Sequence, residues 1–265
     1  MRRAEFIAHR GSSYRAPENT LAAFRLGWQE TITCELDVRC SGDGQLVVLH
    51  DETALRTTGM DLVAARATLA QLQSLDAGAW KGAEWLGERI PSLGEALAAM
   101  PPERRLLIEI KGGPAMIPEL ARVVHASGRG ADVALQGFDL ATCVAAKSAL
   151  PGRPVYLLAW LGKSRRDAPK AWARALAAVR HHGLDGLGVN AAPALNRRSI
   201  EDVHASGLVL NIWTIDSVAT ARRLMRLGVD GLITNRPGWL KAQMRVRARK
   251  APPRGARPAK ARRQP

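Results

Sequence analysis

Hydrophobic positions along the chain follow two spacings. Short runs of β-branched and aliphatic residues are typical of buried strands, and most of the longer stretches between them have the apolar spacing of amphipathic helices. The runs that predict strands are 5–9, 33–40, 45–50, 106–111, 132–136, 154–160, 186–190, 208–215 and 230–234. The stretches that predict helices are 19–30, 92–100, 117–128, 140–150, 168–183, 198–207 and 217–228. Strands that alternate with helices of this length indicate βαβ units, a parallel sheet and an α/β fold.

Nine predicted strands are one more than a (β/α)8 TIM barrel contains, and a hairpin accounts for the difference. A parallel return between strands needs a crossover of about a dozen residues, whereas only CSGDG stands between Arg39 and Gln45. Its Asp-Gly pair is a hairpin turn signal. We therefore predict an antiparallel hairpin of 33–40 and 45–50, with one arm outside the parallel barrel. The turn also brings His50 back beside Asp37 and Glu35.

Charged side chains share one face on two of the predicted strands. Because successive strand residues point to opposite faces, Glu35, Asp37 and Arg39 lie on one face of their strand, and apolar residues and cysteines lie on the other. Glu109 and Lys111 likewise share a face of a later strand. Charged faces backed by apolar ones fit barrel strands whose C-terminal ends line a polar mouth. The pattern therefore predicts a polar site at that mouth.

The domain organisation predicted from the sequence is one barrel with an insertion and a tail. Residues 1–240 form the predicted catalytic (β/α)8 barrel. The segment 51–91 is rich in turn residues and too long for an ordinary loop, so we predict an excursion over the barrel mouth, near the active site, before the helix that starts near residue 92. Residues 241–265 are basic and rich in Pro, Arg and Ala, and we expect this tail to be disordered because it can bury little apolar area.

The formal net charge of +15 resembles that of a nucleic-acid-binding protein, so its placement matters. Ten Lys and Arg and no acidic residue fall within 241–265, which leaves +5 for residues 1–240, an ordinary value for a globular domain. No aromatic residue interleaves the basic residues of the tail, so base stacking is unsupported. We expect no specific nucleic-acid partner. A solvated extension is the favoured interpretation, with nonspecific binding to nucleic acid or weak contact with an anionic surface as alternatives.

The sequence also bears on the compartment. No apolar run approaches the roughly 18–20 residues of a membrane span, and the opening MRRAEFIAHRG does not fit a signal peptide. The three cysteines have no metal-binding spacing, and their odd number argues against a disulfide framework. A cytoplasmic protein is the default expectation. The oligomeric state is not indicated.

Seven polar residues at the predicted strand ends form a candidate site: His9, Arg10, Glu35, Asp37, His50, Glu109 and Lys111. Three converging carboxylates would raise one another's pKa unless a cation lies among them. Oxygen ligands favour a hard ion such as Mg²⁺ or Ca²⁺ over Zn²⁺. Arg10 and Lys111 add positive charge that suits an anionic group. His9 and His50 match the need of phosphodiester cleavage for one base and one acid.

Several motifs carry a resemblance to a known family. AHRG…PENTLAAF, ELDV…DGQLVVLHD, RTTG, IPSLGEAL, IEIK, IWTID and GVDGLITNRP occur in order across roughly residues 5–240. The ordered set resembles the glycerophosphodiester phosphodiesterase family. The resemblance implies a (β/α)8 barrel, one divalent metal ion (Mg²⁺ or Ca²⁺, with Mn²⁺ also suitable), and hydrolysis of glycerophosphodiesters to sn-glycerol 3-phosphate and an alcohol. In the mechanism proposed for the family, a glycerol hydroxyl attacks phosphorus and a cyclic phosphate is then hydrolysed.

The resemblance also assigns roles to single positions. The residues that match the family's metal ligands are Glu35, Asp37 and Glu109; those that match its acid/base pair are His9 and His50; those that match its phosphate contacts are Arg10 and Lys111; and Trp213 matches an aromatic residue near the glycerol end. Two positions depart from the family pattern, because Asn235 stands where Asp is usual and Gly137 where Ser is usual. Neither has an assigned role in the chemistry, so we expect them to bear on substrate fit.

Other interpretations stay open at this stage. The same site could act on lysophospholipids, as a lysophospholipase D-type phosphodiesterase, or the barrel could be vestigial in a nucleic-acid- or membrane-binding protein. His50 beside two acids could be a structural histidine–carboxylate pair, and Lys111 could simply pair with Glu109. Trp213 could belong to the core. The joint occurrence of the whole set favours the enzymatic interpretation.

Overall fold

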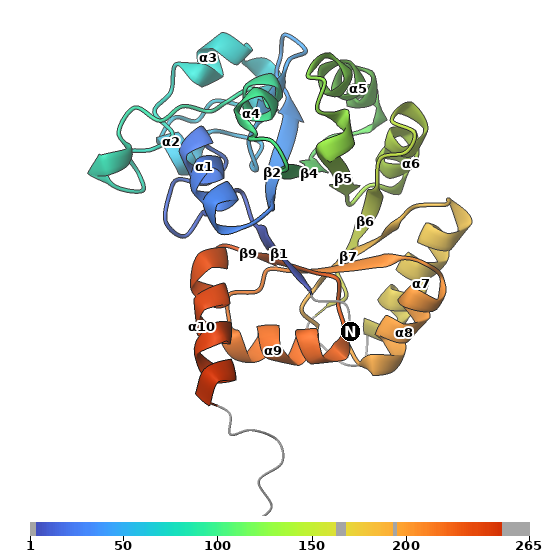
Figure 1. Ribbon diagram of the computed structural model, residues 1–265. Helices are drawn as coiled ribbons and strands as arrows, with labels where there is room; N and C mark the ends of the chain where they lie inside the picture. Colours follow the sequence, from blue (N-terminus) through green and yellow to red (C-terminus); the bar gives the residue numbers. More distant parts are fainter. Residues whose placement is uncertain (1–3, 163–167, 193–194, 251–265) are drawn as a thin grey trace, which may run out of the picture.

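A closed ring of parallel strands forms the centre of the structure (Figure 1). The computed structural model describes residues 4–162, 168–192 and 195–250. The strands in these residues are β1 Glu5–Ala8, β2 Thr33–Cys40, β3 Leu46–Val48, β4 Arg105–Ile110, β5 Val133–Gly137, β6 Val155–Ala159, β7 Gly186–Asn190, β8 Val209–Trp213 and β9 Gly231–Thr234. β1 pairs in parallel with both β9 and β2, which closes the ring, and β3 is the antiparallel strand. The predicted eight-stranded TIM barrel is confirmed.

Helices surround the barrel. They are α1 Leu21–Glu30, α2 Leu55–Thr58, α3 Leu69–Gln73, α4 Leu93–Ala99, α5 Ile117–Ala126, α6 Leu140–Ala149, α7 Ala168–His181, α8 Arg197–Ala205, α9 Val218–Leu227 and α10 Pro237–Lys250. Several begin where a small polar side chain accepts a hydrogen bond from the first turn, as Thr20 does for α1 and Ser92 for α4. Helix α9 ends at Gly228, which has φ +98°. Local capping signals thus set many of the helix boundaries.

The predicted hairpin is present as the antiparallel pair β2–β3. Cys40 pairs with Leu46, and the backbone N–H of Ser41 donates to the carbonyl of Gln45 at 2.8 Å to close the turn. Beyond β3, the N–H of Leu49 donates to the carbonyl of Asp37 at 3.0 Å. The chain is therefore still paired with β2 one residue before His50, which brings this histidine to the mouth.

The segment 51–91 builds a small apolar core of its own. Buried Leu72 and Ile90 pack there with Val47 and Leu49, which belong to β3 and the residue after it. Helices α2 and α3 of this segment lie on the same side of the barrel as α1 and α4 in Figure 1. The hairpin arm that stands outside the parallel ring is thus anchored by the insertion.

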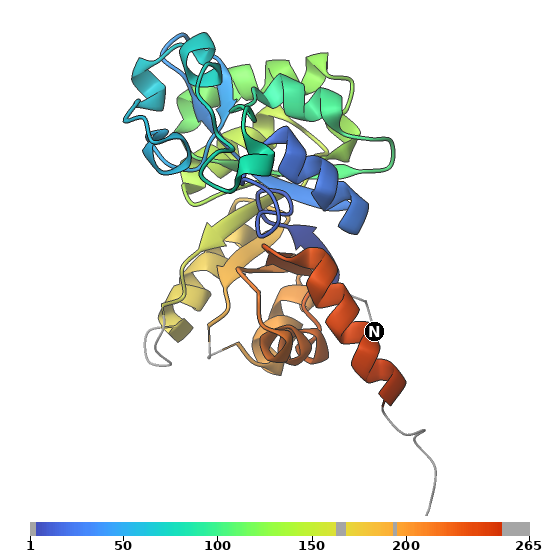
Figure 2. The ribbon, with the colours of Figure 1, turned by 90° about the vertical axis from the view of Figure 1, so that its left-hand side faces the viewer.

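The C-terminal helix α10 corrects the predicted boundary of the tail. The chain stays helical to Lys250, and α10 packs against α1, α9 and β1 (Figure 2). Leu240 is fully buried, and the Lys241 ammonium donates to the backbone carbonyl of Glu30. A disordered tail from residue 241 is therefore wrong for residues 241–250. The basic, polar composition of 241–250 gave no apolar spacing from which this helix could be predicted; the remaining predicted tail, 251–265, lies outside the described residues.

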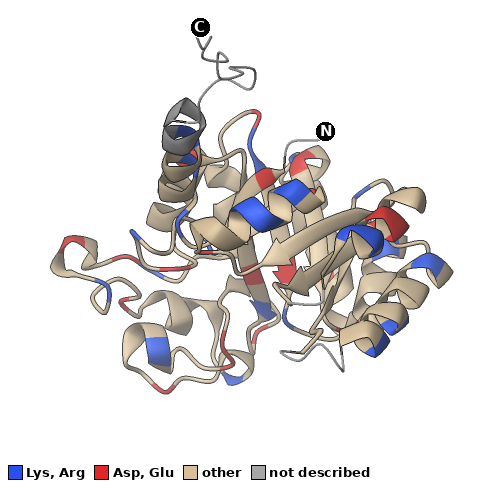
Figure 3. Cartoon of the chain, turned by 90° about the horizontal axis from the view of Figure 1, so that it is seen from below, with Lys and Arg blue, Asp and Glu red and all other residues tan. Residues whose placement is uncertain are grey.

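Charge is distributed unevenly between strands and helices. Lys and Arg lie on several outer helices, whereas Asp and Glu also occur on the strands at the centre (Figure 3). Among the helices of the described chain, none combines the length and apolar character needed to cross a membrane.

Candidate active site

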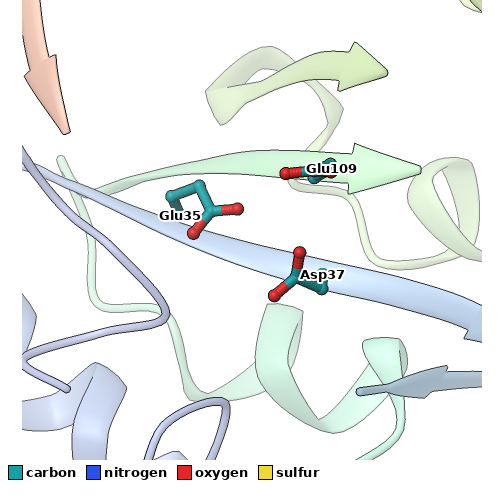
Figure 4. A group of neighbouring side chains, drawn as sticks. All are labelled: Glu35, Asp37 and Glu109. Atoms are coloured by element: carbon teal, nitrogen blue, oxygen red, sulfur yellow. The ribbon is translucent and has the colours of Figure 1, made fainter. Parts of the chain in front are cut away.

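Three carboxylates converge at the C-terminal ends of β2 and β4. Glu35 and Asp37 lie on one face of β2 and are fully buried, and Glu109 on β4 is 7% exposed. The register places Asp37 directly beside Glu109. Figure 4 shows the three side chains facing a common space, and one oxygen from each lies within 4.8 Å of the others. The predicted acidic cluster therefore forms in space.

One oxygen of each carboxylate lacks the regular hydrogen bond from the described residues that a buried carboxylate oxygen normally has. Oε1 of Glu35 accepts no hydrogen bond from any described residue. Oδ1 of Asp37 has Lys111 Nζ at 3.2 Å, and the same ammonium forms an ion pair with Oε1 of Glu109, but neither oxygen accepts a hydrogen bond of regular geometry from the described residues. Buried polar atoms are nearly always satisfied. An all-oxygen donor set with unsatisfied atoms fits a hard divalent cation.

The pKa values of the cluster reflect crowding of like charges. Burial, and then the neighbouring Asp37 and Glu109, raise the pKa of Glu35 well above its ordinary value. Burial and the nearby Asp37 raise the pKa of Glu109 to about 7. Burial also works to raise the pKa of Asp37, but Arg10 and Lys111 outweigh it and lower that pKa. A bound cation would take the place of the protons that the raised pKa values favour.

Arg10 holds a demanding backbone conformation beside the cluster. Its φ is +54°, in the left-handed region that non-glycine residues seldom adopt. This conformation lets its backbone N–H donate to Glu35 Oε2 at 2.9 Å while Nε lies 3.2 Å from Asp37 Oδ2. Nη1 donates to Glu18 Oε1 at 2.7 Å. Arg10 therefore links the first strand to both acids of β2.

His50 enters the site from the hairpin and is held by the insertion. Its Nδ1 lies 2.6 Å from Asp51 Oδ1, and Arg56 on α2 donates to the other oxygen of Asp51 at 2.5 Å. Arg56 also donates twice to Glu18, at 2.8 and 2.9 Å, and Glu18 accepts from Arg10. A continuous chain of ion pairs therefore joins His50 to Arg10 through the insertion, which is how the segment 51–91 reaches the barrel mouth.

The ring nitrogen Nδ1 of His9 has an uncharged hydrogen-bond partner, the side chain of Asn235. Asn235 donates through Nδ2 to Asp216 Oδ2 at 2.6 Å, so its Oδ1 faces Nδ1 of His9 at 2.7 Å. Because Asp216 can only accept, this orientation makes Nδ1 the donor and leaves Nε2 with a lone pair. Burial, and then the charge of Arg10, lower the pKa of His9 to about 4. The sequence assigned Asn235 no role in the chemistry; in the structure it contacts the side chain of His9, a candidate catalytic residue.

A cavity of about 190 Å³ joins these groups. The polar residues that line it are His9, Arg10, Glu35, His50, Glu109, Lys111, Gln136 and Thr214. Trp213 forms an aromatic wall, with the rings of Phe138 and Trp160 at 5.7 and 5.8 Å from it. Phe138 and Trp160 are about half exposed, which gives the cavity an apolar rim. The structure thus brings together all the predicted site residues, with Asp37 reaching the cavity wall through its contacts with Arg10 and Lys111.

Several contributing residues were not assigned from the sequence. Asn19 donates to Asp37 Oδ2 at 2.9 Å from a left-handed backbone, although the sequence placed it only at the start of the predicted helix 19–30. Arg56 lies in the motif RTTG, which was noted only as part of the family resemblance. Glu18 lies in PENTLAAF, where an active-site contact was the secondary interpretation beside a helix entry. Gln136 had no signal beyond its place at a strand end. Among these positions, only Gln136 could have been found from the pattern of polar residues at the ends of predicted barrel strands.

The fold and the site define a TIM-barrel enzyme with an acidic, histidine-flanked centre at the C-terminal mouth. The profile of the Glycerophosphoryl diester phosphodiesterase family matches residues 9–239. The chain belongs to this family. The glycerophosphodiester phosphodiesterase of Caldanaerobacter subterraneus subsp. tengcongensis is 33% identical over 240 residues, covering 88% of this chain and 95% of that protein. A Bacillus subtilis glycerophosphodiester phosphodiesterase is 28% identical over 257 residues, covering 87% and 83% of the two chains.

Solved structures share the fold. A phosphodiesterase from Oleispira antarctica, determined in complex with its product sn-glycerol 3-phosphate, matches with a TM-score of 0.78 and 28% identity over 92% of this chain and 97% of that one. A glycerophosphodiester phosphodiesterase from Agrobacterium tumefaciens matches with a TM-score of 0.73 and 27% identity over 90% of this chain and 99% of the other. The barrel of this chain is therefore the barrel of that family.

Proposed function

We propose that this enzyme hydrolyses glycerophosphodiesters to sn-glycerol 3-phosphate and an alcohol, with the help of one divalent metal ion and of His9 and His50. The observation that carries the proposal is the meeting of three buried carboxylates and two histidines around one cavity. Family membership and the product named for the Oleispira antarctica structure support the same substrate class.

The metal site would consist of Glu35, Asp37 and Glu109. The cation would neutralise the charge of the three buried acids, which Lys111 and Arg10 balance only in part. When bound, such an ion acts as a Lewis acid that polarises a phosphoryl oxygen. Mg²⁺ and Ca²⁺ suit the all-oxygen donor set, and Mn²⁺ is also suitable.

Lys111 and Arg10 would hold the phosphate from the other side. Both side chains line the cavity and are only about 15% exposed, so their charges are poorly screened by water. The planar guanidinium can form two parallel hydrogen bonds with an anion, and the ammonium supplies a compact charge. Trp213 would contact the glycerol end, because its ring forms the apolar wall of the same cavity.

The surroundings of the two histidines favour different roles for them. His9 has the lower pKa and an available lone pair at Nε2, so it would accept the proton of the glycerol C2 hydroxyl as that oxygen forms a bond to phosphorus. Burial, with the charges of Arg10 and Lys111, lowers the pKa of His50, and Asp37 and Asp51 offset that shift only in part. Unlike His9, His50 has a carboxylate, Asp51, at Nδ1, which stabilises the imidazolium, so His50 would donate its proton to the alcohol oxygen as the bond between that oxygen and phosphorus breaks. Water would then open the cyclic phosphate with the two roles exchanged.

The proposal is tested by an assay of glycerol 3-phosphate release from glycerophosphocholine and glycerophosphoethanolamine. Turnover should require Mg²⁺, Ca²⁺ or Mn²⁺ and should stop after chelation. Glu35→Ala should lower kcat/KM by at least about 100-fold, whereas Glu119→Ala, which removes an exposed ion pair with Arg122 on α5, should leave it unchanged. Full activity after exhaustive chelation, or in Glu35→Ala, would contradict the metal assignment. Absence of turnover with every ion would contradict the proposed reaction.

A lysophospholipase D-type activity is the second candidate, and the exposed apolar rim favours it. Phe138 is 51% and Trp160 53% exposed beside the cavity, where an acyl chain of a lysophospholipid could rest. A higher kcat/KM for lysophosphatidylcholine than for glycerophosphocholine would establish this alternative. Cytoplasmic placement, the lack of a specific nucleic-acid partner and the weak contact of the basic tail with anionic surfaces stay predictions from the sequence.

A further inference from the structure

Large apolar side chains that are exposed to solvent gather toward the mouth of the barrel. Four of them follow the C-terminal ends of barrel strands (Tyr14, Phe138, Trp160 and Trp239), and four lie in the insertion 51–91 (Leu55, Met60, Trp80 and Leu86). Among the exposed large apolar residues of the described chain, only Ile32 lies at the opposite end, directly before β2. Single exposed apolar side chains are ordinary, whereas their concentration on one face marks an interaction surface.

Next to β1 and β9, cations stack on the exposed aromatic rings. The guanidinium carbon of Arg236 lies 4.2 Å from the ring centre of Tyr14 and 4.0 Å from that of Trp239. The Lys81 ammonium lies 5.4 Å from the ring centre of Trp80 and donates to the carbonyl of the residue before Tyr14 at 2.7 Å. The three rings are between 40% and 59% exposed. Tyr14, Trp80, Lys81, Arg236 and Trp239 therefore form one continuous surface, the aromatic–cationic patch.

Arg236 is a cation without an acidic partner in this patch. Its side chain forms no ion pair or hydrogen bond with the residues that the structure describes, and its Nε is buried. The contacts with two aromatic rings hold the guanidinium in place, while its N–H groups stay without an acceptor. Phosphate and carboxylate oxygens are the strongest acceptors for a guanidinium. The patch thus offers a fixed positive charge to an anion from outside the chain.

We propose that the aromatic–cationic patch docks the enzyme on a membrane surface that contains anionic phospholipids, with Arg236 bound to a lipid phosphate. Trp and Tyr rings settle at the headgroup level of a bilayer, because they combine an apolar body with a polar tip. Cations beside them are attracted to the negative surface, which strengthens binding by about fivefold for each cation. The patch supplies both kinds of group together.

The surroundings of the patch fit the same partner. Helix α10, whose first turn contains Trp239, has five Lys and Arg and no acidic residue in its sequence. In the insertion, Leu55, Met60 and Leu86 add exposed apolar area. Apolar side chains of this kind can enter the headgroup region of a bilayer, whereas a polyanion such as RNA offers them little. The surface therefore suits a lipid surface better than a nucleic acid.

The patch borders the cavity without being part of it. The carbonyl of Asn235 accepts from the N–H of Tyr14 at 2.9 Å, and its side chain contacts His9. No residue of the patch lines the cavity itself. Docking would therefore hold the cavity mouth close to the lipid headgroups, and it does not depend on the proposed reaction.

The test is co-sedimentation of the full chain with two kinds of vesicle, one of phosphatidylcholine alone and one of equal parts phosphatidylcholine and phosphatidylglycerol. We expect the wild type to partition at least about tenfold more strongly onto the vesicles with phosphatidylglycerol. Trp239→Ala and Arg236→Gln should each lower that partition coefficient by about five- to tenfold. Trp80→Ala changes the patch from the insertion side, leaves α10 untouched and should also lower it.

Matched controls separate the patch from general charge and apolarity. Ile32→Ala removes an exposed apolar side chain at the opposite end of the barrel. Arg122→Gln removes one positive charge from the exposed face of α5, the same change of net charge as Arg236→Gln. Both controls should partition within about twofold of the wild type. Circular dichroism and Tm verify that each variant is folded.

Three results would overturn the proposal. The first is vesicle binding that none of the patch substitutions weakens, or that Ile32→Ala and Arg122→Gln weaken equally. The second is vesicle binding that deletion of residues 251–265 abolishes and Trp239→Ala leaves unchanged, which would assign the contact to the tail. The third is the absence of vesicle binding together with binding of single-stranded RNA that Trp239→Ala weakens, which would identify the patch as a nucleic-acid surface.

Discussion

Asn235 Oδ1 lies 2.7 Å from Nδ1 of His9, across a sequence separation of 226 residues. The two residues meet because β1 and β9 are adjacent in the closed barrel, and Asp216 fixes the orientation of the amide. A neutral amide holds the imidazole without favouring its charged form as strongly as a carboxylate would. A neutral partner such as Asn235 is therefore consistent with the low pKa of His9, about 4, which keeps its ring uncharged at low pH.

The first prediction concerns Asn235→Asp. A carboxylate at this position should raise the pKa of His9 from about 4 by about 1–2 units, because it stabilises the imidazolium. If His9 is the base, it acts only when neutral, so the acidic limb of the kcat/KM profile should move to higher pH. Activity at pH 5 should fall relative to activity at pH 8, as measured by a pH series.

Asn235→Ala provides the contrast for that experiment. It removes the hydrogen bond without adding charge, so it should lower kcat/KM without moving the acidic limb upward. An unmoved acidic limb in Asn235→Asp, with the protein folded as judged by circular dichroism, would show that His9 does not limit activity on the acid side.

The second prediction concerns the stability of the metal-free enzyme. The pKa of Glu109 is raised in the folded state to about 7 from an ordinary value of 4.5, so its stabilising contribution is present below 4.5 and is lost as pH rises toward 7. Glu109→Gln removes this titration. The Tm of the variant minus the Tm of the wild type should therefore increase between pH 4.5 and 7 in the presence of a chelator, as measured by thermal unfolding.

Addition of a divalent metal ion should have the opposite effect on the Tm difference between Glu109→Gln and the wild type. A divalent ion needs the ionised carboxylates, so it should raise the Tm of the wild type more at pH 8 than at pH 5. It should raise the Tm of Glu109→Gln less than that of the wild type. A Tm difference that stays constant with pH would show that Glu109 ionises normally.

The third prediction concerns Arg56, which joins the insertion to the site. Arg56→Lys cannot reproduce the bidentate contact with Glu18 together with the hydrogen bond to Asp51. We expect kcat/KM to fall by about 10-fold because His50 and Arg10 lose their orientation. Steady-state kinetics with glycerophosphocholine provides the measurement.

A matched control for Arg56 lies on α5. Arg122 forms a two-point ion pair with Glu119 on an exposed helix face, so Arg122→Lys loses comparable contacts away from the cavity. It should retain full activity. Equal activity of Arg56→Lys and Arg122→Lys would show that the ion-pair chain does not position the site.

The fourth prediction separates the last helix from the residues after it. Deletion of residues 251–265 should leave Tm and kcat/KM unchanged. Deletion of 241–265 also removes Lys241, which binds the Glu30 carbonyl, and the outer part of α10, so Tm should fall by about 2–4 °C or more. Two truncated proteins compared by thermal unfolding would decide this. Equal Tm values for both would contradict a stabilising role of α10 beyond Leu240.

Local sequence determined the barrel class and the acidic half of the site. Alternating strands and helices predict βαβ units, and the short CSGDG turn predicts the hairpin, because both depend on neighbours within a few residues. Strand parity likewise places Glu35 and Asp37 on one face. These features need no knowledge of distant contacts.

The closed barrel alone decided which distant residues complete the site. The contact of His9 with Asn235 depends on β1 and β9, which lie at opposite ends of the chain and are paired in the barrel. The packing of α10 onto α1 is of the same kind, since it joins residues about 200 positions apart. Periodicity carries no information about such pairs, so the tertiary structure had to supply them.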